Sequence, residues 1–144
     1  MFSKACKYGI RAVLFLVVNG DENSRISPET IAETLEVPRH FLAKILQQLS
    51  KNGLVSSVKG PGGGFFLSPE NRQQHVSEII YAIDGRDVLN ACVLGLERCS
   101  SKSPCPLHFQ AFSYREGLRL QLENQTIDGL GRGLNSNQLK NIEL

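Results

Sequence analysis

The feature that most constrains the fold of this chain is a glycine-rich segment between two short β-prone runs. Residues 54–58 and 65–67 are rich in β-branched and aromatic types, and four glycines and Pro61 lie between the runs. Because glycine accepts positive φ angles and adds no bulk, the segment predicts a β-hairpin with a narrow tip. The tip is longer than a tight turn needs. A tip without side chains can lie against a sugar–phosphate backbone or enter a minor groove, and Lys59 at its base can pair with phosphate.

Two short helices are predicted immediately before this hairpin. Ser27 and Pro28 are typical of an N-cap and a first helical turn, and Pro38 opens a second helix that continues to about residue 51. The second helix has an apolar stripe at helical spacing, expected to be buried: Phe41, Leu42, Ile45, Leu46 and Leu49. Its opposite face is basic and rich in amides. Two helices, a tight turn and a following hairpin predict a winged helix-turn-helix.

Basic residues on two predicted helices suggest contacts with DNA. In a helix-turn-helix, the N-terminal residues of the second helix reach base edges, which here selects Pro38, Arg39, His40, Ala43 and Lys44. The alternative is an ordinary helical hairpin on a protein surface. A first helix, predicted over residues 3–18, has Lys4, Lys7 and Arg11 on one face. That face is either a solvated surface or a set of phosphate contacts.

The charge of the chain is unevenly distributed. Residues 1–75 hold nine Lys/Arg and six Asp/Glu, whereas residues 76–144 hold seven and eight. A basic first half fits a nucleic-acid partner and also fits an ordinary surface. The longest apolar run, residues 12–18, is too short to span a bilayer, and no signal-peptide pattern opens the chain, so a cytoplasmic location without membrane association is expected. Catalytic motifs are absent from the sequence, and no enzyme activity is expected.

Three cysteines and a histidine in the second half have the spacing of metal ligands. Cys92, Cys99 and Cys105 are separated by six and five residues, and His108 follows Cys105 by three positions. The intervening glycine, serine and proline residues predict a loop that can wrap a metal centre. The donors suit zinc or an iron–sulfur cluster, and composition alone leaves redox-active or free thiols open as well. Cys6, far away in sequence, is expected to be a core or near-surface thiol.

The remaining segments complete a mostly helical fold with a small β-hairpin. Residues 76–83 carry a compact apolar stripe, and residues 106–124 carry a near-heptad one: Leu107, Ala111, Tyr114, Leu118 and Leu122. The second stripe predicts a partner helix in a dimer, with a monomer core as the alternative. We expect a winged helix-turn-helix DNA-binding domain over 1–85, a ligand loop and dimerisation helix over 86–130, and a flexible tail over 131–144.

Several of these segments resemble the IscR/NsrR/CymR family of bacterial winged-helix regulators. The run KNGLVSSVKGPGGGF at residues 51–65 is similar to the wing of that family, residues 7–12 to its first helix, and residues 76–85 to the helix after its wing. The resemblance implies a transcription regulator, a homodimer that binds a palindromic operator in double-stranded DNA. With the helix patterns above, the residues expected at the DNA are Lys7, Tyr8, Arg11, Ser27, Pro38, Arg39, His40, Phe41, Ala43, Lys44, Lys59, Gly60, Pro61, Gly62, Gly63 and Gly64.

The resemblance also implies a cofactor. IscR-like and NsrR-like members bind an iron–sulfur cluster through three cysteines in the matching segment. In IscR-like members a histidine three positions after the third cysteine completes the site, and His108 matches it, which favours two irons over four. The chain is then expected to sense cluster supply, oxidative stress or nitric oxide. Alternatives are a thiol- or zinc-based redox regulator and a winged-helix module that binds protein.

Overall fold

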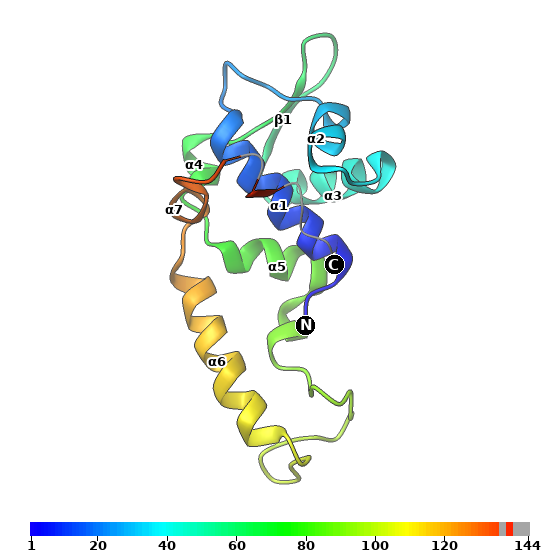
Figure 1. Ribbon diagram of the computed structural model, residues 1–144, viewed down its shortest axis with the longest axis vertical. Helices are drawn as coiled ribbons and strands as arrows, with labels where there is room; N and C mark the ends of the chain where they lie inside the picture. Colours follow the sequence, from blue (N-terminus) through cyan, green and yellow to red (C-terminus); the bar gives the residue numbers. More distant parts are fainter. Residues whose placement is uncertain (136–137, 140–144) are drawn as a thin grey trace.

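A computed structural model describes residues 1–135 and 138–139 of the chain. Figure 1 shows a winged-helix unit at one end and an arm that extends from it. The unit contains α1 to α5, the wing and α7, and the arm contains α6 and the loop before it. The bounds in chain order are α1 Lys4–Asn19, α2 Pro28–Leu35, α3 Arg39–Lys51, β1 Ser56–Val58, β2 Gly64–Phe66, α4 Pro69–Arg72, α5 Val76–Asp84, a 3-10 helix η1 Arg86–Leu89, α6 His108–Asn124 and α7 Ile127–Gly131. The predicted fold class, mostly α with a small β-hairpin, is confirmed.

The helix-turn-helix begins where the sequence predicts. The Ser27 hydroxyl accepts a hydrogen bond from the Thr30 N–H at 3.1 Å and caps α2. Glu36 ends α2 in a left-handed conformation with φ of 59°, which reverses the chain within a few residues. Pro38 then stands directly before α3 as its N-cap residue. Together these residues hold α2 and α3 at a short, defined turn.

Helix α1 is the centre of the core, and α2, α3, α5 and α7 all pack against it. Residues 11–16 of α1 are all buried, so this part of the helix is enclosed on every side. Gly9 marks the closest crossing. A β-carbon at this position would lie 2.5 Å from Ile83 Cδ1 of α5 and 3.2 Å from Ile45 Cγ2 of α3. The absence of a side chain therefore lets three helices meet at one point.

The wing is an antiparallel hairpin in which Ser57 pairs with Phe65 and Val58 with Gly64. Strand β1 is shorter than the predicted run 54–58, and β2 is shifted by one residue from the predicted run 65–67. The flanking Leu54 and Leu67 are 2% and 1% exposed and belong to the core. Strand β2 also pairs with Ile26, the residue before the α2 cap, through hydrogen bonds of 2.9 and 2.8 Å between its backbone and that of Phe65. The wing is therefore joined directly to the start of α2.

The wing requires glycine at its four positions for two different reasons. Gly60 and Gly62 have φ of 89° and 75° with open space around them, so the turn conformation itself favours glycine. At Gly63 and Gly64 there is no room: a β-carbon would lie 2.1 Å from the Val58 carbonyl oxygen at the first and 2.6 Å from the Ile26 carbonyl oxygen at the second. Half of this tip is thus shaped by contacts inside the protein.

Asn71 of α4 fastens the base of the wing. It is 5% exposed, its side-chain oxygen accepts from the Ser56 hydroxyl and the Ser68 N–H, and its amide donates to the Gly53 carbonyl. One buried amide thus ties together the end of α3, strand β1 and the start of α4.

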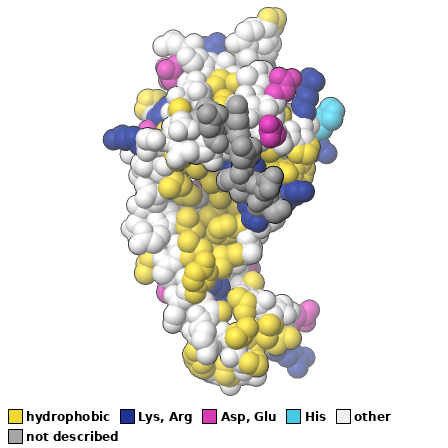
Figure 2. Space-filling view, viewed as in Figure 1, with side chains coloured by type: hydrophobic (Ala, Val, Ile, Leu, Met, Phe, Trp, Pro, Cys, Tyr) yellow, Lys and Arg dark blue, Asp and Glu magenta, His cyan; other side chains and the backbone are white. Residues whose placement is uncertain are grey.

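The arm consists of α6 and the loop that precedes it. Tyr81 of α5 donates a hydrogen bond of 2.8 Å to the Glu123 carboxylate, near the end of α6 that joins the winged-helix unit. The other end of α6 and the loop stand away from that unit, and hydrophobic side chains gather over this region in Figure 2. Phe109, Phe112 and Tyr114 are 59%, 51% and 67% exposed. The helix therefore leaves a large apolar surface uncovered by its own chain.

Helix α7 returns the chain to α1. Arg72 makes a 2.9 Å ion pair with Asp128 and donates to the Val17 and Gly20 carbonyls, which locks α7 beside the end of α1. The predicted tail, residues 131–144, lies partly outside the described residues, at 136–137 and 140–144. Leu139, which is described, is 4% exposed and packs into the core. No described helix has the length and apolar composition needed to cross a membrane.

Candidate DNA interface and metal centre

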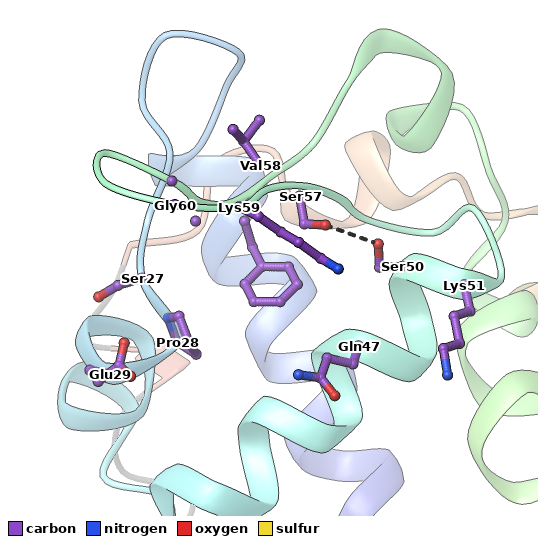
Figure 3. Close-up of a pocket in the computed structure, with 13 residues that line it drawn as sticks. Ser27, Pro28, Glu29, Gln47, Ser50, Lys51, Ser57, Val58, Lys59 and Gly60 are labelled. Carbon is purple, nitrogen blue, oxygen red and sulfur yellow. Dashed lines mark hydrogen bonds between the residues drawn. The ribbon is translucent and has the colours of Figure 1, made fainter.

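A groove of about 670 Å³ runs between α2, α3 and the wing. Figure 3 shows its walls: the first residues of α2 face the outer side of α3, and the wing closes the third side. Ser50 of α3 and Ser57 of β1 hold the wing to the helix through a hydroxyl contact of 3.4 Å. The lining residues are Ser27, Pro28, Glu29, Gln47, Ser50, Lys51, Ser57, Val58, Lys59, Gly60, Gly63, Gly64 and Phe65.

The predicted recognition residues on α3 are mostly exposed. Pro38, Arg39, His40 and Lys44 are open to solvent, and Ala43 is half-buried. The Arg39 guanidinium makes a 2.9 Å ion pair with Glu29 of α2. A backbone N–H at the start of α2 and this guanidinium hold the pKa of the Glu29 carboxyl below its ordinary value. Arg39 can exchange this exposed partner for a phosphate or a base at little cost.

Phe41 differs from its predicted place in the core. The side chain is 40% exposed, although its position in the apolar stripe predicts burial. One edge of the ring meets Tyr8 of α1 in a T-shaped contact with centroids 5.7 Å apart. Phe41 therefore lies at the rim of the core, where it is also accessible from the α3 surface.

Two of the α1 residues that are predicted to contact DNA are buried. Arg11 is 6% exposed, and its guanidinium donates to the Leu139 carbonyl at 2.9 Å and to the Leu35 carbonyl at 3.0 Å. The prediction that Arg11 contacts phosphate is contradicted, because the tail residue Leu139 and the end of α2 enclose it. Tyr8 is 8% exposed, between Phe41 and the Arg11 guanidinium. Lys7 is half-buried.

The outer part of the wing tip is open to solvent. Lys59, Gly60, Pro61 and Gly62 are all exposed, and Gly63 and Gly64 are half-buried. The groove adds polar residues that the predicted set omits: Gln47, Ser50, Lys51 and Ser57. Their sequence signal is the spacing of Gln47 and Lys51, four residues apart on the outer face of α3. The position of the wing beside that face depends on the tertiary fold, so the spacing alone does not predict it.

The three loop cysteines converge at the far end of the arm. The sulfur atoms of Cys92, Cys99 and Cys105 all lie within 4.8 Å of one another. Cys92 Sγ and Cys105 Sγ are 3.7 Å apart, and Cys99 Sγ lies 3.2 Å from Nδ1 of His108. His108 opens α6, and its N–H donates to the Cys105 carbonyl at 3.1 Å. The three predicted cysteine ligands therefore form one cluster, and His108 contacts it through Cys99, whereas Cys6 is buried in the core.

The pKa values of two thiols in this cluster are shifted in opposite directions. The backbone N–H of Leu96 is the main cause that lowers the pKa of Cys92 to about 7. The Cys105 N–H lowers the pKa of Cys99, but desolvation and the thiols of Cys105 and Cys92 outweigh it and leave that pKa above its ordinary value. Cys92 is thus the first of the two to become a thiolate. Thiolates, not thiols, bind metal, so occupation of the site releases protons.

A family profile covers almost the whole chain. The profile of the Rrf2 family, described as an iron-dependent transcriptional regulator, matches residues 2–132. The chain belongs to the Rrf2 family. It is therefore a transcriptional regulator and not an enzyme, in agreement with the absence of catalytic motifs.

Individual relatives of this Rrf2 protein agree. An HTH-type transcriptional regulator of Aquifex aeolicus is 36% identical over 110 residues, which cover 75% of each chain. The transcriptional regulator IscR of Klebsiella pneumoniae is 30% identical over 136 residues, 94% of this chain and 80% of that one. Among solved structures, the global cysteine regulator CymR of B. subtilis superposes with a TM-score of 0.73 at 23% identity, over 94% of this chain and 98% of that one. The resemblance to the IscR/CymR regulators is confirmed, and the last comparison shows the shared fold.

Proposed function

We propose that this Rrf2 regulator binds a palindromic operator in double-stranded DNA as a homodimer, and that an iron–sulfur cluster controls this binding. The ligands are Cys92, Cys99, Cys105 and His108. The observation that carries the proposal is the convergence of three cysteine sulfurs to within 4.8 Å in a protein that also has a winged helix. The signal is cluster supply, oxidative stress or nitric oxide.

The DNA surface consists of the exposed start of α3 and the wing tip. In this arrangement α3 enters the major groove, and Arg39, His40 and Lys44 face base edges. Lys59 and the side-chain-free tip follow the sugar–phosphate backbone. The groove of the protein between α3 and the wing supports this assignment. Its hydroxyl, amide and lysine groups can bond DNA phosphates that lie between the DNA grooves contacted by α3 and by the wing.

The donor set fits a cluster. The 3.7 Å between Cys92 Sγ and Cys105 Sγ suits two thiolates on one tetrahedral metal, since metal–sulfur bonds of about 2.3 Å place them about 3.8 Å apart. Cys99 and His108 form a second close pair at 3.2 Å. Three thiolates and an imidazole are four donors, and this number supports a two-iron cluster, in which each iron takes two protein ligands. A four-iron cluster takes one ligand at each iron.

The dimer is supported by the apolar surface of α6. Leu107, Phe109 and Tyr114 are 44%, 59% and 67% exposed, too much for a helix whose partner is only its own chain. A second copy is the occupant that matches a palindromic site, because two-fold symmetry in the protein requires two half-sites about 34–36 Å apart or a multiple of that distance.

Control of DNA binding follows from where the ligands sit. His108 is the first residue of α6, and Cys105 bonds to it through the backbone, so any change in the loop acts on the start of the dimer helix. When bound, the cluster supplies a centre that reacts with oxidants and nitric oxide. Loss of a ligand frees the loop and alters the packing of α6. The spacing of the two recognition helices then changes, and the fixed spacing of the half-sites makes affinity sensitive to it.

One observation favours a second candidate, a thiol- or zinc-based redox regulator. Cys92 Sγ and Cys105 Sγ are close, and the pKa of Cys92 is lowered to about 7, as a reactive thiol requires. The same donors also suit tetrahedral zinc. Metal content after anaerobic purification separates the two candidates.

The test is anaerobic purification with absorption spectroscopy and binding of operator-like duplexes. We expect a coloured protein with bound iron and sulfide, and duplex affinity that differs between the loaded and the cluster-free forms. His108→Ala should change the spectrum and speed cluster loss. His75→Ala is the matched control, since His75 is exposed and caps α5 without a side-chain bond. A colourless, zinc-bound protein under these conditions would refute the cluster.

A further inference from the structure

Arg115 occupies an unexpected place on α6. It is 7% exposed and is the one residue of this fully described helix that is buried. One position away, Tyr114 is 67% exposed. A helix that leaves aromatic rings in solvent and buries a charged residue reverses the usual preference of both. The burial of Arg115 therefore calls for a reason within the arm.

The contacts of Arg115 lead to the cysteine loop. Its Nη1 donates a hydrogen bond to the carbonyl of Ala91, the residue directly before Cys92. Its Nε is buried and has no hydrogen-bond partner. Among the described residues, no carboxylate lies within ion-pair distance of this guanidinium. A buried cation with one backbone acceptor is unfavourable unless an anionic group lies near it.

We infer that Arg115 is the positioning residue of the metal centre. It fixes the backbone that presents Cys92, and its charge offsets that of the occupied site. The inference rests on the proposed function. Three thiolates outweigh the formal positive charge of an oxidised two-iron, two-sulfide core, so the loaded site is anionic and becomes more so on reduction. The buried guanidinium and this anionic centre stabilise each other, which explains why a helix with so little burial encloses an arginine.

Arg119 gives the matched control on the same helix. It lies one turn later, and its guanidinium is paired with both Glu116 and Glu123. Its charge is already balanced within α6. Replacement of Arg119 removes a positive charge from the arm without touching the loop, so it reports the general effect of charge and helix stability.

The experiment compares full-length wild type with Arg115→Gln, Arg115→Lys and Arg119→Gln. Co²⁺ is the first probe, because thiolate-bound cobalt absorbs strongly and needs no sulfide. We expect Arg115→Gln to bind Co²⁺ about 10- to 100-fold more weakly, the usual effect of losing a group that orients a metal ligand. Arg119→Gln should bind like wild type. Circular dichroism and the unfolding temperature show whether each variant is folded. If Arg115→Gln does not fold, Arg115→Lys replaces it in the Co²⁺ comparison with wild type.

The reduction potential of the reconstituted cluster is the second readout. A cation near the cluster favours the more negative, reduced form, so Arg115→Gln should shift the potential downward. Arg115→Lys, which keeps the charge, should restore the potential more fully than the Co²⁺ affinity. Wild-type Co²⁺ affinity and potential in folded Arg115→Gln would overturn the inference. Wild type that assembles no cluster would refute the proposed function, while the Co²⁺ measurements would still decide the role of Arg115.

Discussion

Replacement of Asn71 by alanine should loosen the wing and destabilise the fold. The change removes two bonds to the side-chain oxygen, from the Ser56 hydroxyl at 2.7 Å and the Ser68 N–H at 2.9 Å, and one from the amide to the Gly53 carbonyl at 2.8 Å. Gly53 is exposed, so water replaces that partner. The Ser68 N–H and the Ser56 hydroxyl are half-buried and lose about 1 kcal/mol each, with a further contribution from the small cavity.

We therefore expect Asn71→Ala to lose about 2–3 kcal/mol of unfolding free energy. For a chain of this size that corresponds to a fall of roughly 5–10 °C in Tm. Urea unfolding followed by circular dichroism measures the loss, with an unchanged m-value if only the folded state is affected. Asn23→Ala is the control, because Asn23 is exposed and its side chain makes no hydrogen bond to a described residue. A loss in Asn71→Ala no larger than in this control, below about 0.5 kcal/mol, would refute the reasoning.

Three other changes test separate parts of the structure. Gly9→Ala places a methyl group 2.5 Å from Ile83 Cδ1, so denaturant unfolding should show a loss of about 1–3 kcal/mol; wild-type stability would show that the helices separate freely. Both arginine partners lower the pKa of Asp128, Arg132 first and Arg72 second, so its stabilisation is present above the unfolded value of about 3.9 and disappears as the pH falls through the folded pKa. The stability difference between wild type and Asp128→Asn, measured from pH 7 to pH 2, should therefore shrink toward zero in acid, and a difference independent of pH would contradict the ion pair. Lys59→Ala should weaken duplex binding uniformly across sequences and reduce the salt-dependence slope by about one, whereas Lys102→Ala in the cysteine loop should leave the slope unchanged.

Local signals explain most of what could be predicted from the sequence. Ser27 and Pro28 mark the start of α2 because capping depends on residues a few positions apart. The convergence of Cys92, Cys99 and Cys105 follows from a short loop whose spacing restricts how far the sulfurs can separate. His108 joins them because it opens the next helix.

The residues whose predicted positions differ from the structure are held by contacts with distant parts of the sequence. Helical periodicity predicts that Arg11 shares a face with Lys7, but it cannot show that Leu139, far along the sequence, covers that face. Phe41 belongs to the apolar stripe of α3, yet its side chain is 40% exposed at the edge of the core, where it meets Tyr8. Local sequence accounts for the bond between Asn71 and Ser68, but the bonds from Asn71 to Gly53 and from Arg115 to Ala91 join groups that only the tertiary fold brings close.

The two kinds of glycine in the wing divide it into a variable half and an invariant half for protein engineering. Lys59 and Pro61 can be replaced by other residues, because both are exposed to solvent. Asparagine is the best first choice at Gly60 and Gly62, because it tolerates positive φ better than other residues do. Any side chain at Gly63 or Gly64 would instead push apart the hairpin and the start of α2. A library intended to change DNA preference should vary residues 59–62 and keep the next two positions as glycine.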